Sequence, residues 1–312
     1  EAFKLSGTLA KDDEGRAVAL VREGDVLQEL ERADEAMSRY RTVLEKYPKT
    51  AVAGKLKTVV NARELEAKGR SLYRDFKFAE AAAAFAEAGR ADPSRRERMT
   101  YFSALCQYGL GRDDAAENAI RGLSKDGRDR EVRRLATLWL AKLLYNRREW
   151  KESGRLFASV AGEKGNPRES AEALLWAARA AFFDGNFGQA IQLSAEVADR
   201  YADSKVKPQA LMVQGEALIE LSRFDEAVLV FDRVLVAEDI RQGDRVRAKM
   251  LKADALYAMG SDNPSRYAAA LEAYRDVRFG GDLSASERLL LSFRIARSLD
   301  KLKRTEEALD QY

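Results

Sequence analysis

Apolar residues recur along the chain at the three-to-four-residue spacing of a helix face, and no segment keeps the strict alternation typical of a strand. A longer period lies on top of this one. It consists of three positions, as in Gly24, Ala36 and Tyr40. A small residue is followed twelve positions later by a second small residue, and the residue four positions after that is usually large and apolar. The first small residue returns at spacings of 35–45 residues, at Gly24, Gly69, Ala104, Ala141, Ala178, Gly215, Ala253 and Ala296. We therefore predict an almost wholly helical chain of repeated helix pairs.

The repeated residue types suit close packing of two helices. A small residue on each helix lets the partner approach, and the large apolar residue is expected to fill the groove between successive repeats. Pro48 and Pro93 follow predicted second helices, where a residue without an amide hydrogen ends the helix. Leucine at Gly69 or Ala227 should overpack such a pair at a cost of roughly 1–3 kcal/mol or more.

This pattern resembles the tetratricopeptide repeat, a helix–turn–helix unit of about 34 residues with Ala, Phe and Pro at set positions. The resemblance implies an all-α fold, a right-handed α-solenoid of about eight helical hairpins that makes a single array over residues 1–312. The expected repeats are 17–48, 62–93, 97–128, 134–166, 171–203, 208–240, 246–280 and 289–312. Apolar spacing in 49–61 predicts an extended first helix for the second repeat, and 261–265 should lengthen the turn inside the seventh.

The two ends share the register of the interior repeats. Glu1 and Ala2 match Glu35 and Ala36, one repeat later, so residues 1–16 are expected to be the second helix of an upstream repeat. Tyr312 falls within another second helix. We expect the chain to be a fragment of a longer array.

Composition narrows the possible functions. The chain has 46% hydrophobic and 34% charged residues, one Cys and no His. These counts exclude Ser-His and Cys-His catalysis, histidine metal ligands and an internal disulfide, so we expect a non-enzymatic protein without metal or cofactor. No apolar run of about 18 residues occurs. Cys106, between Leu105 and Tyr108, is expected at a half-buried, unreactive helix position.

A concave surface lined by the first helices is implied by the resemblance. On the middle repeats its expected residues are cationic and aromatic, two types that often anchor interfaces. They are Arg63, Arg70, Tyr73, Arg98, Tyr101, Tyr108, Lys142, Tyr145, Arg179 and Phe182. We expect this groove to hold an extended or helical protein segment with acidic and apolar side chains. The alternative is that the aromatic rings only pack between adjacent helices. Equivalent positions in the last three repeats are mixed in charge and include Glu216, Arg247 and Asp254.

Two other binding modes fit the sequence less well. The carboxylate clamp of some proteins of this family needs Lys and Asn at set positions of the first helix. At those positions the second repeat has Glu66 and Arg70, and the fifth repeat has Leu175 and Arg179. Residues 121–152 hold ten cations and five anions, which we interpret as a solvated helix face, with RNA binding as the alternative. The net charge of +3 is close to balance, and neither nucleic acid nor a small-molecule substrate is expected.

A second resemblance concerns location. Residues 198–204, 208–211 and 215–218 are similar to repeats of bacterial envelope proteins, such as the periplasmic Tol-Pal-associated cell-division coordinator and the outer-membrane assembly lipoprotein. This resemblance implies a periplasmic or outer-membrane-associated scaffold that meets the membrane only through an anchor outside this chain. A secretion or polysaccharide-export component, a cytoplasmic location, and an enzyme whose catalytic part lies outside these residues are the alternatives.

Overall fold

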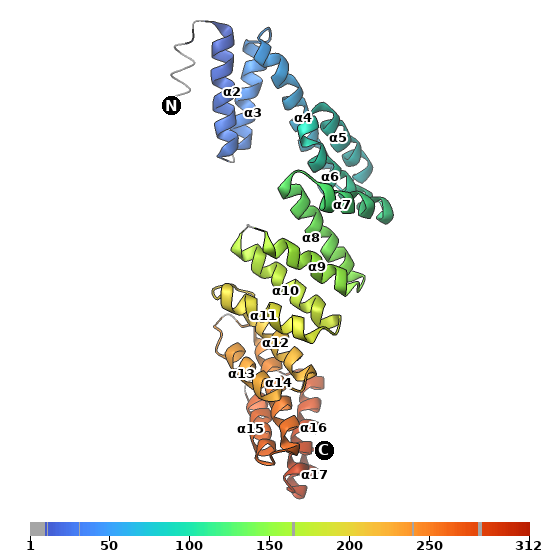
Figure 1. The fold of residues 1–312 in the computed structure, drawn as a ribbon, viewed down its shortest axis with the longest axis vertical. Helices are drawn as coiled ribbons and strands as arrows, with labels where there is room; N and C mark the ends of the chain where they lie inside the picture. Colours follow the sequence, from blue (N-terminus) through green and yellow to red (C-terminus); the bar gives the residue numbers. More distant parts are fainter. Residues whose placement is uncertain (1–9, 11, 31, 164–165, 239, 280–282) are drawn as a thin grey trace. The chain divides into compact units, whose positions relative to one another are not determined.

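The computed structural model describes residues 10, 12–30, 32–163, 166–238, 240–279 and 283–312. Every regular element among these residues is a helix, so the all-α fold of helical hairpins is confirmed (Figure 1). The contacts divide the chain into two compact units, Glu1–Trp139 (unit 1) and Leu140–Tyr312 (unit 2). Each unit is described by itself, and the continuity of the eight repeats as one solenoid stays a prediction.

The described residues of unit 1 form three helical hairpins and the start of a fourth. In Figure 1 the two helices of the first hairpin lie side by side, and from α3 to α7 each helix packs on the one before it. The elements are α2 (Asp13–Glu29), α3 (Ala33–Lys46), α4 (Ala51–Arg74), α5 (Phe78–Ala91), the 3-10 turn η1 (Pro93–Arg95), α6 (Arg96–Gly109), α7 (Asp113–Asp126) and the first part of α8 (Arg130–Asn146).

Unit 2 repeats the same arrangement, with consecutive helices again in contact. Its elements are the end of α8, α9 (Trp150–Gly162), α10 (Pro167–Phe183), α11 (Phe187–Arg200), α12 (Lys207–Glu220), α13 (Phe224–Leu235), α14 (Gln242–Ala258), the 3-10 turn η2 (Met259–Ser261), α15 (Ser265–Phe279), α16 (Ala285–Lys301) and α17 (Thr305–Gln311).

The helix bounds confirm two expectations and correct a third. Helix α4 has 24 residues, which is the extended first helix predicted from residues 49–61, and η2 with the following turn occupies the predicted insertion at 261–265. The first helix of every predicted repeat begins earlier than expected, as at Asp13 instead of 17, where the Asp12 side chain caps the start of α2. Residues 13–16 therefore belong to α2, not to an upstream helix, and Glu1 and Ala2 lie outside the described residues.

The repeated small and large residues meet inside each hairpin. A Cβ added at Gly69 would lie 2.7 Å from the ring of Phe85, and one at Gly215 would lie 2.6 Å from the ring of Phe231. Phe85 also stacks on Phe102 of the next repeat, with ring centroids 5.2 Å apart. The large residue therefore fills the space within its own hairpin first, and not only the groove between repeats as the sequence predicted.

The turn from the first to the second helix of a repeat uses a left-handed backbone conformation. Gly111 (φ 72°) and Gly185 (φ 76°) occupy this position in two repeats, whereas Ser222 (φ 58°) occupies it in another. A side chain in this region costs energy that glycine does not pay. The same turn is therefore more strained where the sequence lacks glycine.

Replacing Ser222 by glycine should raise the free energy of unfolding of unit 2 by about 0.5–1 kcal/mol, because it relieves the left-handed strain at an exposed site. Urea denaturation followed by circular dichroism measures the change. The reverse substitution, Gly185→Ser, is the control and should lower stability. Equal stability of S222G and the unmodified chain would contradict the strain.

Side chains of one hairpin cap the helix that opens a later one. The Glu14 carboxylate on α2 accepts hydrogen bonds from the backbone amides of Ala51 (2.9 Å) and Val52 (3.2 Å), at the start of α4. On α6, Glu97 likewise accepts from two amides that precede α8, at 3.0 and 2.8 Å. These bonds lower the pKa of Glu97. They satisfy amides that a helix start leaves without an intrahelical partner.

Candidate functional site

Glu66 of α4 is the centre of an arginine cluster in unit 1. Its side chain is buried, at 5% exposure, and accepts hydrogen bonds from Arg70, one turn further along α4, at 2.7 and 3.1 Å. Arg95 of η1 also donates to this carboxylate, and Arg98 of α6 lies 3.9 Å from it. Burial alone would raise the pKa of Glu66, but Arg95 and Arg70 together hold it below its ordinary value. The carboxylate is therefore ionised and orients the arginines around it.

The arginine cluster lines a surface cavity of about 370 Å³, which we call the arginine compartment. Its lining residues are Gln28, Ala33, Asp34, Met37, Arg63, Glu66, Ala67, Arg70, Arg95 and Arg98. Arg63 donates to Gln28 and its guanidinium lies 5.2 Å from the ring centroid of Tyr40. The Nε atoms of Arg63 and Arg95 are buried without a hydrogen-bond partner. Four arginines and two carboxylates leave this compartment basic.

A second cavity, of about 480 Å³, adjoins the first, and we call it the apolar compartment. It is lined by Ala67, Arg70, Tyr73, Arg74, Phe85, Phe102 and Leu105. Arg70 stands at the boundary, with its guanidinium 4.8 Å from the ring centroid of Phe102. Since Ala67 and Arg70 line both cavities, the two compartments are neighbouring sections of one groove along α4, the unit 1 groove.

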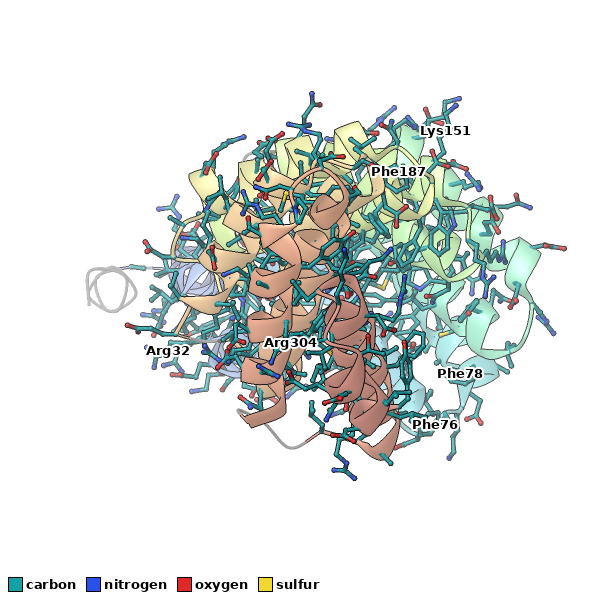
Figure 2. The ribbon with its side chains drawn as sticks, turned by 90° about the horizontal axis from the view of Figure 1, so that it is seen from below. Arg32, Phe76, Phe78, Lys151, Phe187 and Arg304 are labelled. Carbon is teal, nitrogen blue, oxygen red and sulfur yellow. The ribbon has the colours of Figure 1, made fainter. Side chains whose placement is uncertain are left out.

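Aromatic side chains gather at the turn after α4. Tyr73 meets Phe78 edge to face at 5.4 Å, and Phe78 meets Phe76 at 6.0 Å. Figure 2 shows Phe76 and Phe78 next to each other. Phe76 is 79% exposed and adopts a left-handed backbone conformation. This cluster lies at the end of α4 where Tyr73 and Arg74 line the apolar compartment.

Unit 2 has a groove of mixed chemistry with a cavity of about 270 Å³. It is lined by Tyr145, Arg179, Phe182, Phe183, Gln209, Met212, Val213, Glu216, Arg241, Asp244 and Arg247. The Arg179 guanidinium lies 5.1 Å from the ring centroid of Trp176, and Arg247 forms an ion pair with Glu216 at 2.7 Å. Burial raises the pKa of Glu216 in spite of Arg247 and Arg179. We call this the unit 2 groove.

The structure brings most of the predicted groove residues to these cavities. Arg63, Arg70, Arg98 and Tyr73 line the unit 1 groove, and Tyr145, Arg179 and Phe182 line the unit 2 groove.

Three predicted residues line neither groove. Tyr101 is buried against Phe102, with ring centroids 5.6 Å apart, and burial raises its pKa. Tyr108 packs edge to face on Trp139 at 5.2 Å, and Lys142 is exposed. For Tyr108, whose ring contacts Trp139 of α8, the alternative of packing between helices describes its position.

The sequence did not single out several groove residues. Arg95 precedes α6 in a 3-10 turn, and Arg241 precedes α14, so neither has a first-helix position in the repeat. Phe102 was missed because it lies beside the expected position of Tyr101. The signal that could have found Arg95 is its place after Asp92, which accepts from the Ser94 amide and starts the turn.

Cys106 is fully buried, not half-buried as predicted. Burial raises the pKa of its thiol to about 11, which keeps it protonated near neutral pH. We expect a chromogenic disulfide reagent to leave this thiol unmodified in the folded chain and to modify it fully in denaturant. Rapid labelling of the folded chain would contradict this burial.

The described residues include neither a membrane-spanning helix nor a cluster suited to a metal ion. No described helix combines the length and apolar character needed to span a bilayer. No group of three or more acidic or cysteine side chains among them could hold a metal ion.

Comparison with known proteins identifies the repeats. Tetratricopeptide-repeat family models match residues 18–50, and residues 175–244 and 212–285. These two stretches of the chain match the tetratricopeptide repeat, and they cover most of α2 and all of α3 in unit 1, together with much of unit 2. Tetratricopeptide repeats mediate protein–protein interactions and are typically non-catalytic scaffolds, and neither matching model describes a catalytic family.

Several solved structures are similar to this chain at low sequence identity. The apo form of RapI is 11% identical, over 95% of this chain and 84% of that one, with a TM-score of 0.52. PilW, described as a type IV pilus biogenesis factor, is 19% identical over 74% of this chain and 98% of that one (TM-score 0.46). The apo form of the quorum sensor NprR from B. thuringiensis is 13% identical, over 100% of this chain and 89% of that one, with a TM-score of 0.44. No curated protein matches the sequence.

Proposed function

We propose that the chain is a non-catalytic protein-binding scaffold of the bacterial cell envelope, whose first helices hold a partner segment with acidic and apolar side chains. The observation that carries this proposal is the unit 1 groove, where four arginines lie beside an apolar compartment. Arginine and aromatic side chains are the ones that most often dominate interface energetics. The envelope location is supported by the resemblance of residues 198–218 to repeats of periplasmic proteins.

The geometry of the arginines suits recognition of carboxylates. Arg70 stacks on Phe102 in unit 1 and Arg179 stacks on Trp176 in unit 2. Such cation–π contacts hold a guanidinium in place before a ligand arrives, which reduces the entropy lost on binding. The aromatic rings also offer apolar surface beside each charge. A segment that carries both acidic and apolar residues would therefore complement either groove.

Charge reversal tests the grooves. Labelled synthetic peptides rich in Glu, Asp, Leu and Phe should bind the chain, and replacing Arg70 and Arg179 together by Glu should abolish that binding. The control variant reverses two exposed cations that line neither groove, Arg90 and Lys151. Fluorescence anisotropy measures affinity. Unchanged binding by the groove variant would reject the proposal.

The location requires a separate measurement. Fractionation of bacterial cells that express the intact gene product should place it with periplasmic or outer-membrane markers. Recovery in the cytoplasmic fraction would overturn the envelope part of the proposal and leave the binding part standing.

A further inference from the structure

The two compartments of the unit 1 groove differ in chemistry and share a wall. Ala67 and Arg70 line both, and Ala67 is exposed on the surface of α4. One side of this wall offers guanidinium groups, and the other offers the rings of Phe85 and Phe102 with Leu105. A single short segment that lies across Ala67 can therefore place one side chain in each compartment.

The guanidinium groups are not equally available to a ligand. Arg70 and Arg95 already donate to Glu66, and Arg70 is also stacked on Phe102. Arg98, by contrast, lies 3.9 Å from Glu66, and its side chain is 39% exposed. Arg63 donates to Gln28, and its Nε atom is buried. An incoming anion would therefore find donors at Arg98, whereas Glu66 keeps Arg70 and Arg95 occupied.

We propose that the unit 1 groove binds a protein segment in which a carboxylate side chain and a large apolar side chain are near neighbours. The carboxylate pairs with Arg98 in the arginine compartment, and the apolar side chain enters the apolar compartment. This inference rests on the proposed function and specifies the ligand of one of its two grooves.

The shared wall limits how far apart the two ligand side chains are. In an extended segment, side chains two positions apart point to the same side and are separated by about 7 Å. This separation suits two adjoining compartments that have a pair of lining residues in common. Ligand residues separated by a long spacer would place only one group in the groove at a time. The specific requirement is therefore that a carboxylate residue and an apolar residue stand two positions apart in the bound segment.

Two synthetic peptides of identical composition test the requirement. In the first, each Leu or Phe stands two positions from a Glu and the Gly-Ser stretch lies at one end, whereas in the second the Gly-Ser stretch separates the apolar residues from the Glu residues. We expect the unmodified chain to bind the first peptide about tenfold more tightly than the second in fluorescence anisotropy, because only the first fills both compartments. Equal affinities would overturn the inference.

Four single variants locate the binding. Ala67→Trp fills the shared wall at an exposed position, and its control is Lys68→Trp, the next exposed residue of α4, which lines neither compartment. Arg98→Gln removes the available donor, and its control is Arg90→Gln on α5. We expect A67W and R98Q each to weaken binding of the first peptide about tenfold or more and both controls to leave it unchanged. Circular dichroism checks that every variant is folded.

The outcomes separate this inference from the proposed function. If the first peptide binds, A67W and R98Q have no effect, and Arg179→Glu abolishes binding, the ligand occupies the unit 2 groove. The inference is then wrong and the proposed function stands. If no acidic and apolar peptide binds the unmodified chain, both fail.

Discussion

Replacing Gly69 by leucine should lower the free energy of unfolding of unit 1 by about 3 kcal/mol or more. A Cβ at this position would lie 2.7 Å from the ring of Phe85, which is itself 1% exposed. The ring is also stacked on Phe102, so it cannot move without disturbing that contact. The substitution should therefore push α4 and α5 apart and disturb the apolar compartment that Phe85 lines.

Urea denaturation followed by circular dichroism measures this effect, and helix α4 supplies a matched control. Gly54 lies on the same helix with no atom within 4 Å of an added Cβ. Gly54→Ala should therefore stabilise unit 1 by about 0.5–1 kcal/mol through helix propensity, whereas Gly69→Ala should destabilise it. Effects of the same sign at the two glycines would contradict the close approach of α4 and α5.

Replacing Glu66 by glutamine should lower the free energy of unfolding of unit 1 by about 1–3 kcal/mol at neutral pH. The substitution removes the charge that orients Arg70, Arg95 and Arg98. The loss is smaller than for a fully buried pair, because the three arginine side chains are 26–48% exposed and recover water.

The pH dependence of this effect has a definite sign. The folded state lowers the pKa of Glu66, so its stabilisation is complete above the ordinary glutamate pKa of about 4.3. The stabilisation is lost as pH falls through the lower pKa of the folded state. The difference between the unmodified chain and E66Q should therefore shrink in acid. The control, Glu87→Gln, changes an exposed glutamate of α5 and should be nearly neutral. A difference that is the same at pH 7 and at pH 2 would contradict the lowered pKa.

The helical hairpins were predictable because their determinants are local and repeated. Gly69, Ala81 and Phe85 report the contact of two helices that follow each other directly in the chain. The starts of the first helices were less predictable, since a capping residue such as Asp12 decides them. Which repeats pack into one compact unit depends on contacts summed over many residues, so the division after Trp139 has no sequence signal.

The candidate site was predictable only in part for a related reason. Register within the repeat placed Arg63, Arg70 and Arg98 on one groove, because equivalent first-helix positions face the same way. Register did not reveal that Glu66 gathers those arginines, since that role depends on Arg95 from a neighbouring turn. It also did not separate Tyr101, which packs inward, from groove residues, because an aromatic ring serves either purpose.

The carboxylates of Glu14 and Glu97 have a consequence for engineering of this chain. Each carboxylate belongs to one hairpin but accepts hydrogen bonds from backbone amides of the next. Glu14 accepts from the first turn of α4, and Glu97 accepts from two amides just before α8. Excising or transplanting a hairpin would remove the carboxylate acceptor and leave these amides without a hydrogen-bond partner. Chimeras cut between these hairpins should therefore fray at the new junction unless the glutamate travels with the segment that it serves.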